Sequence, residues 1–192
     1  MRAQLLIYIR SGTIGWVGMK RFKFVAFAIC LAVQSVLGGC AGPSALESQV
    51  KQRDARLARM YFLREARLVA LYGRVATTEI KIDGKPVGAV IGGTYFFVDR
   101  PPGTYKLSAD TGPLAMAYEA ETRVEAGQTY YFGIGTPQTA APGQNLLNQA
   151  VGGSSGEQMR PTSPFMGGFS AAAFYQMEAA TGAAAIAELK AQ

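Results

Sequence analysis

Short apolar runs separated by turn residues fill residues 57 to 134 of this 192-residue chain. In residues 77–83, Ile80 and Ile82 alternate with charged residues, as a strand with one solvated face requires. Asp83-Gly84 then supplies the positive φ angles of a tight hairpin turn. Strand-like runs with a turn signal between each pair predict an antiparallel β-sandwich.

Strand-like composition recurs along the chain. The segments are 58–64, 77–83, 86–91, 94–98, 105–108, 116–124 and 129–134, and residues 169–177 are a candidate for a last strand. We therefore expect a mainly β fold, a single sandwich domain at 57–178 with about seven to eight strands. The alanines that follow favour a short C-terminal helix within 179–192.

Residues 136–168 interrupt the strand pattern with six glycines and four prolines. A segment of this length and composition predicts a flexible loop. Its few apolar residues have two interpretations: they pack on the edge of the sandwich, or they form a partner surface that orders on contact. These residues are Leu146, Leu147, Met159, Phe165 and Met166.

An export signal precedes the predicted domain. Three basic residues between positions 20 and 23 are followed by residues 24–36, in which only Gln34 and Ser35 are polar. The apolar run is shorter than the ~20 residues that a bilayer span needs, so we expect a signal helix within a signal peptide at 1–39. Because Met19 begins an adequate signal by itself, our hypothesis is that Met19 is the true start.

The signal ends in Leu37-Gly38-Gly39-Cys40, which resembles the lipobox of bacterial lipoproteins. The resemblance implies that the Cys40 thiol is alkylated with diacylglycerol and that cleavage makes Cys40 the acylated N-terminus. Residues 40–56 would then be a lipidated tether to the membrane. Since Ala41 follows the cysteine, the resemblance implies the periplasmic face of the outer membrane in a Gram-negative cell. An uncleaved signal anchor and a plain secretory signal are the alternatives.

The positive charge of the chain belongs largely to this signal. The chain has 19 basic and 13 acidic residues, but five basic and no acidic ones precede Ala41, which leaves 14 minus 13, or +1. The exported part therefore does not predict nucleic-acid binding. Cys30 is lost with the signal and Cys40 is assigned to lipid, so no disulfide is expected.

Three turn motifs support a family resemblance. They are Ile82-Asp83-Gly84-Lys85-Pro86-Val87-Gly88, Pro101-Pro102-Gly103-Thr104-Tyr105 and Ala126-Gly127-Gln128-Thr129-Tyr130-Tyr131. In this order they resemble a family of small β-sandwich domains of unknown function found in bacterial lipoproteins, similar in layout to PEGA and carboxypeptidase-regulatory-like sandwiches. The resemblance covers about residues 59–134. It implies a prealbumin-like sandwich used as a binding or spacing module, and it carries over no catalytic residue.

The residue types argue against catalysis. The chain has no histidine, which excludes Ser-His-Asp and Cys-His arrangements and His-ligated zinc. Residues 152–156 match the G-x-S-x-G motif, but they lie in a Gly/Ser-rich segment with no His to act as base. Glu119 and Glu121 share one face of a strand and are better explained as a solvated face. We expect no catalytic residue, no cofactor and no metal, and thus no enzyme.

Two classes of function remain. The first is a lipid-anchored cell-envelope lipoprotein that acts as a non-enzymatic interaction or spacing module, with another envelope protein or peptidoglycan as partner. The second is a small-ligand or glycan-binding lipoprotein that uses an aromatic sheet face and the 136–168 loop. A concave aromatic pocket beside that loop would favour the second class, and a filled core would favour the first.

Overall fold

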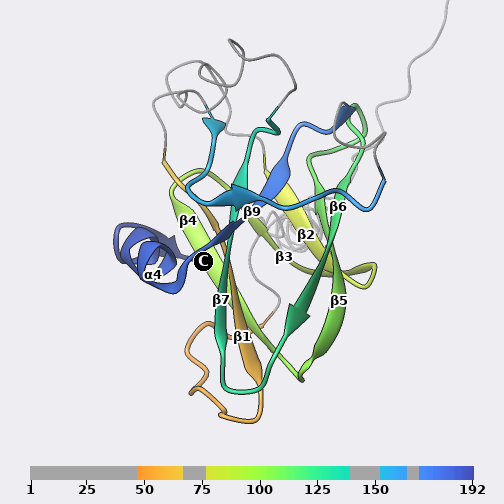
Figure 1. Ribbon diagram of the computed structural model, residues 1–192. Helices are drawn as coiled ribbons and strands as arrows, with labels where there is room; N and C mark the ends of the chain where they lie inside the picture. The colour runs from red at the N-terminus through yellow and green to blue at the C-terminus, as the bar shows by residue number, and fades with distance from the viewer. Residues whose placement is uncertain (1–46, 67–76, 139–151, 164–168) are drawn as a thin grey trace, which may run out of the picture. The chain divides into compact units, whose positions relative to one another are not determined.

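The computed structural model describes residues 47–66, 77–138, 152–163 and 169–192 (Figure 1). All of them belong to one compact unit, Gly42–Gln192. Within these residues, ten strands form two sheets, which confirms the mainly β fold class. The predicted signal helix, like Cys40, lies outside the described residues. No helix within the described residues is both long enough and apolar enough to cross a bilayer.

The strands account for nearly half of the described residues. Their bounds are β1 Ala58–Arg64, β2 Thr78–Ile82, β3 Lys85–Val90, β4 Thr94–Arg100, β5 Gly103–Asp110, β6 Tyr118–Val124, β7 Thr129–Gly135, β8 Glu157–Gln158, β9 Ala173–Met177 and β10 Lys190–Ala191. Eight strands have five residues or more, which agrees with the expected number, and β8 and β10 add two short pairings. The strand predicted at 116–124 begins only at Tyr118, so Met116 lies in the preceding loop.

The two sheets differ in strand direction. The smaller sheet, β3-β2-β5-β6, is antiparallel throughout. The larger sheet has the order β10-β4-β1-β7-β9-β8 and contains two parallel pairs, β1 with β7 and β10 with β4. A purely antiparallel sandwich is therefore the wrong expectation for this sheet. No hairpin joins the strands of either parallel pair, so nothing local forces them to be antiparallel.

The predicted hairpin at Asp83-Gly84 is confirmed. The two residues have φ angles of 50° and 76°, and β2 pairs with β3 on either side of them. Positive φ at both central positions is the requirement of a type I′ turn. The Asp83 carboxylate also accepts a hydrogen bond from the Lys106 N–H at 2.9 Å, which ties the turn to β5.

Aromatic rings of the larger sheet fill the space between the sheets. Phe62 lies between Phe96 and Phe132 of the neighbouring strands, with centroids 5.4 and 5.5 Å away. Phe174 meets Phe62 at 6.3 Å in an edge-on arrangement. Buried residues of the smaller sheet complete this core, among them Ile80, Ile82, Val87, Leu107 and Val124. Each large side chain buried in this way contributes about 1.5–3 kcal/mol.

Helix α4, Ala179–Ala187, packs on the outer face of the larger sheet (Figure 1). Gly182 is its buried residue and faces Tyr131, where any Cβ would overlap the ring. The cluster beneath and beside the helix is apolar: Leu63, Tyr131, Met177, Ala185, Ile186 and Leu189. The C-terminal helix is therefore confirmed, although it ends at Ala187 and the chain then adds β10 to β4.

Replacing Gly182 with Ala should lower the free energy of unfolding by about 1–3 kcal/mol, because the added methyl group must displace Tyr131 or the helix. At an exposed helix position the same replacement would stabilise by up to about 1 kcal/mol. Urea denaturation followed by circular dichroism measures the difference. The matched control is Ala183→Gly on the exposed side of α4, expected to cost about 1 kcal/mol through helix propensity alone. A Gly182→Ala variant as stable as the wild type would contradict the described packing.

Candidate functional site

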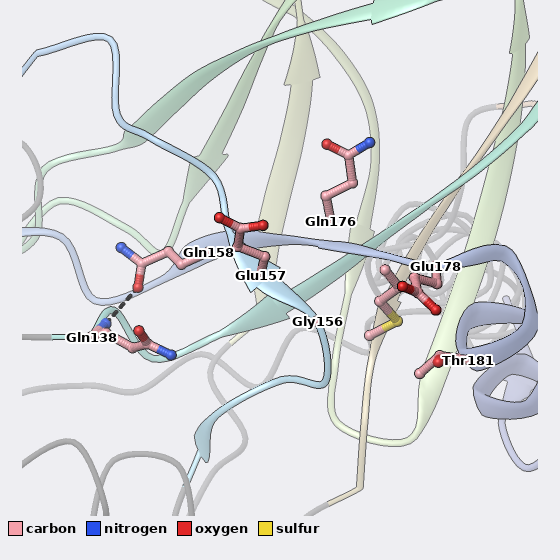
Figure 2. A pocket seen from close by; sticks show the side chains of 8 residues that line it. Gln138, Gly156, Glu157, Gln158, Gln176, Glu178 and Thr181 are labelled. Carbon is pink, nitrogen blue, oxygen red and sulfur yellow. Dashed lines mark hydrogen bonds between the residues drawn. The ribbon is translucent and has the colours of Figure 1, made fainter.

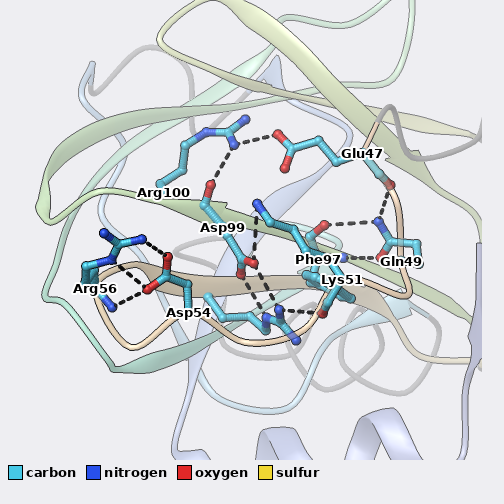
Figure 3. A network of polar contacts seen from close by, with 9 residues as sticks. Glu47, Gln49, Lys51, Asp54, Arg56, Phe97, Asp99 and Arg100 are labelled. Carbon is cyan, nitrogen blue, oxygen red and sulfur yellow. Dashed lines mark hydrogen bonds and ion pairs between the residues drawn. The ribbon is translucent and has the colours of Figure 1, made fainter.

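Residues 47–56 are here called the N-terminal strap, and the first part of the strap lies along the edge of β4 that faces away from β1 (Figure 3). The Gln49 side-chain amide donates to the Phe97 carbonyl at 3.1 Å, and its oxygen accepts from the Phe97 N–H at 2.7 Å. These are the backbone groups that another strand would otherwise bond. β10 bonds the same edge at Thr94 and Tyr95. The strap and the C-terminus together close this side of the larger sheet.

A buried ion pair holds the strap to the sheet. The side chain of Asp99 on β4 is 2% exposed and accepts two bonds from the Arg59 guanidinium, at 2.8 and 2.9 Å. Arg59 also donates to the Lys51 carbonyl of the strap at 3.0 Å and lies 3.9 Å above the Phe97 ring. The hydrogen bonds to Asp99 raise the pKa of Arg59. One guanidinium thus joins the strap, β1 and β4.

Both ends of the strap are also bonded to the domain. Near its start, the Glu47 carboxylate pairs with Arg100 at 2.5 Å. Near its end, the Arg53 guanidinium donates to the Gly127 carbonyl in the turn between β6 and β7. Residues 47–56 belong to the segment that the sequence predicts as a lipidated tether. In the structure this part of the tether is packed on the sandwich.

The turn from the strap into β1 contains a carboxylate with a lowered pKa, that of Asp54. The Asp54 carboxylate accepts bonds from the backbone N–H and the guanidinium of Arg56, both at 2.9 Å. These bonds lower the pKa of Asp54 to about 2. A lowered pKa favours the folded state above the ordinary carboxyl value, and this contribution is lost as the pH falls toward 2. The Asp54 side chain is 32% exposed, so solvent screens this effect.

A polar pocket of about 730 Å³ lies beside β8 and β9 (Figure 2). Its lining consists of Gln138, Gly156, Glu157, Gln158, Gln176, Met177, Glu178 and Thr181. The Gln138 N–H donates to the Gln158 side chain at 2.6 Å, which joins two walls. Among these lining residues there is no aromatic ring to stack on a sugar, so a ligand here would meet amides and carboxylates.

Aromatic side chains do gather on the outer face of the larger sheet, outside this pocket. Tyr61 stacks on Tyr131 with centroids 5.2 Å apart and planes 10° from parallel. Phe97 and Tyr95 lie 5.5 and 6.0 Å from Tyr61. Helix α4 packs over Tyr131, and Arg59 lies over Phe97. The row is therefore partly covered by the chain itself.

The structure describes one of the five residues predicted as a partner surface. Met159 is half-buried against the core, its N–H donates to the Phe174 carbonyl at 2.9 Å, and its own carbonyl accepts from the Tyr118 hydroxyl. This position agrees with the interpretation that apolar residues of 136–168 pack on the sandwich. The others, Leu146, Leu147, Phe165 and Met166, lie outside the described residues, as does the lipid-attachment candidate Cys40.

The serine of the G-x-S-x-G match is a packing residue. Ser154 is 3% exposed and lies against Gly133 of β7, where a Cβ would overlap its hydroxyl oxygen. Within the described residues this hydroxyl has no hydrogen-bond partner. Glu119 pairs with Lys106 at 2.7 Å, which fits a solvated strand face. Sequence reasoning missed Gln49 and Asp99. In the sequence, each is marked only by being a polar residue in or near a strand at the edge of the sheet.

Metal ligands are not grouped in the described ranges. No set of three or more Asp, Glu, His or Cys side chains lies close enough there to hold an ion.

Asp99→Asn should lower the free energy of unfolding by about 3 kcal/mol, because it leaves the buried Arg59 guanidinium without its counter-charge. Urea denaturation at neutral pH measures this loss. Glu47→Gln is the matched control, since it neutralises a more exposed carboxylate of the same network and should cost less than about 1 kcal/mol. Equal effects of the two changes would contradict the central role of Asp99.

Comparison with known proteins identifies a likeness for the middle of the chain. No curated protein matches it. Residues 54–144 match the model of a family described as "Protein of unknown function (DUF2846)". The matched range begins inside the strap and contains β1 through β7. The expected resemblance to an uncharacterised domain is thereby supported in its coarser form: this part of the chain is similar to the DUF2846 domain, whose function is unknown.

Proposed function

We propose that this protein is a lipid-anchored cell-envelope lipoprotein whose β-sandwich acts as a non-enzymatic interaction or spacing module. The short stretch of sequence between Cys40 and the bonded residue Glu47 supports this most directly. Glu47 is bonded to Arg100 of the sandwich, and only the six residues 41–46 separate it from Cys40. A lipid on Cys40 would therefore act on the domain through a short connection.

The length of that connection limits how far the domain can lie from the lipid. An extended chain covers at most ~3.6 Å per residue, so the seven steps from Cys40 to Glu47 span no more than about 25 Å. The whole predicted tether, 40–56, would reach more than twice as far if it were free. Packing of the strap thus turns a long tether into a short one, which suits a module that works close to a membrane.

The pairing of polar groups supports a non-enzymatic role. Arg59 and Asp99 are bonded to each other, Lys106 is paired with Glu119, and the Ser154 hydroxyl is buried. The charged groups are thus bonded to one another within the domain and the serine hydroxyl is enclosed by packing, which supports a structural role for all of them. A partner of such a module would be another envelope protein or peptidoglycan. In a Gram-negative cell, Ala41 would direct the lipid to the periplasmic face of the outer membrane.

The pocket beside β8 favours a second candidate, binding of a small polar ligand. Gln138 and Glu157, both within the predicted 136–168 loop, line it, and its amides would bond to hydroxyl or amide groups. The aromatic sheet face that the glycan-binding alternative relies on is instead covered in part by α4. Saturable binding of a soluble glycan that is lost in Gln176→Ala would favour this candidate over the first.

Cys40→Ala should leave the protein unprocessed and without lipid, because the thiol is the proposed site of alkylation. Expression in bacteria fed radiolabelled palmitate, followed by electrophoresis, shows both effects as a larger band without label. Cys30→Ala is the matched control: it removes the other cysteine of the chain and should leave size and labelling unchanged. A labelled product of normal mature size from Cys40→Ala would overturn the proposal.

A further inference from the structure

Three large apolar side chains are exposed together at one end of the sandwich. Leu114 is fully exposed and Met116 is 47% exposed in the loop between β5 and β6, and Phe169, before β9, is 70% exposed. We call these three residues the apolar tip. Among the described residues, Val50 is the one other large hydrophobic side chain with such exposure. Single exposed apolar side chains are common on protein surfaces, whereas a contiguous group of them marks an interaction site.

Hydrogen bonds hold the tip in place. The Met116 N–H donates to the Phe169 carbonyl at 3.2 Å, which joins the two segments. At the base of the loop, the Gly112 N–H donates to the Asp110 carboxylate at 2.9 Å, and Lys81 bonds the same carboxylate at 3.1 Å. The apolar side chains are thus presented by a loop that is fastened to β2 and β5.

The tip lies at the end of the sandwich opposite the strap. β5 runs from the turn at 101–102, next to Arg100, to Asp110 below the tip, and its eight residues span about 26 Å. In Figure 1 the orange strap is at the bottom, while the green loop between β5 and β6 and the blue stretch before β9 meet at the top. In the lipid-anchored protein proposed above, Glu47 would lie within about 25 Å of the lipid, and the tip would be at the far end of the domain.

The chemistry of the tip fits a protein better than a lipid surface. Residues 111–117 contain no charged side chain. At the base of the loop, the carboxylates of Glu79 and Asp110 share Lys81 at 3.9 and 3.1 Å. A surface that binds anionic lipid carries Lys or Arg next to its apolar residues, and 111–117 offers none.

We propose that the apolar tip docks into an apolar recess on another envelope protein. The choice of a partner away from the anchoring membrane rests on the lipid anchor proposed above. The two aliphatic side chains of the β5–β6 loop and the aromatic side chain before β9 would serve as a small group of anchors, because a few central residues carry most of the energy of a protein interface.

Photo-crosslinking in cells tests this docking on the full-length protein. A photoreactive phenylalanine analogue replaces Leu114 or Phe169 in the tip. The matched controls carry the analogue at Thr104 or Gln128, at the strap end of the domain. All four positions are exposed to solvent. We expect one adduct common to both tip positions and absent from both control positions. Mass spectrometry should identify it as another envelope protein crosslinked within an apolar recess. Met116→Ser should lower its yield about tenfold, as loss of one anchor predicts, without shifting the melting temperature.

Four results would overturn the docking proposal: no tip-specific adduct, an adduct to a second copy of this chain, an adduct within the same chain, or flotation with phosphatidylglycerol vesicles that depends on Leu114 and Phe169.

Fractionation of the same cells separates this proposal from the lipid anchor. A tip-specific adduct from protein that is not in the membrane fraction would contradict the anchor alone. Anchored protein without the adduct would contradict the docking alone.

Discussion

The edge strands of the two sheets carry N–H and C=O groups that must be bonded or blocked, and three described segments outside the long strands serve this need. At β4, the Gln49 amide bonds both backbone groups of Phe97, and β10 bonds the neighbouring stretch. At β6, the Thr162 N–H donates to the Glu119 carbonyl at 2.9 Å. Pro86 lies in edge strand β3, where a missing N–H costs little. The strap, residues 157–162 and the C-terminal tail are thus integral parts of the sandwich.

Local features of the fold could be predicted from the sequence, and features set by distant contacts could not. The alternation around Ile80 and the Asp83-Gly84 turn depend on neighbouring residues, so both appear where expected. The parallel pairing of β1 with β7 joins strands that are far apart in the chain, and no local pattern encodes its direction. In the sequence, Gly182 looks like an interruption of an alanine-rich helix. In the structure, a glycine is needed at this position because a side chain there would overlap the Tyr131 ring.

The candidate site shows the same division. The strap is polar, so hydropathy predicts a free tether; it is instead held by hydrogen bonds and by the ion pair of Asp99 with Arg59, which hydropathy does not register. Met116 fits the alternation of a strand, but Phe169 bonds its N–H and the side chain faces solvent. Together these two findings define a domain with a packed N-terminal strap at one end and exposed apolar residues at the other.

The proposed function depends on whether the N-terminal residue of the mature chain carries a lipid, because the proposed orientation of the domain at the membrane follows from it. Mass spectrometry of the N-terminal peptide, released from protein extracted with detergent from a membrane fraction, measures this directly. The account predicts a peptide that starts at Cys40 and carries a diacylglyceryl group on its sulfur. A mature chain that starts at another residue, or an unmodified Cys40, would contradict it.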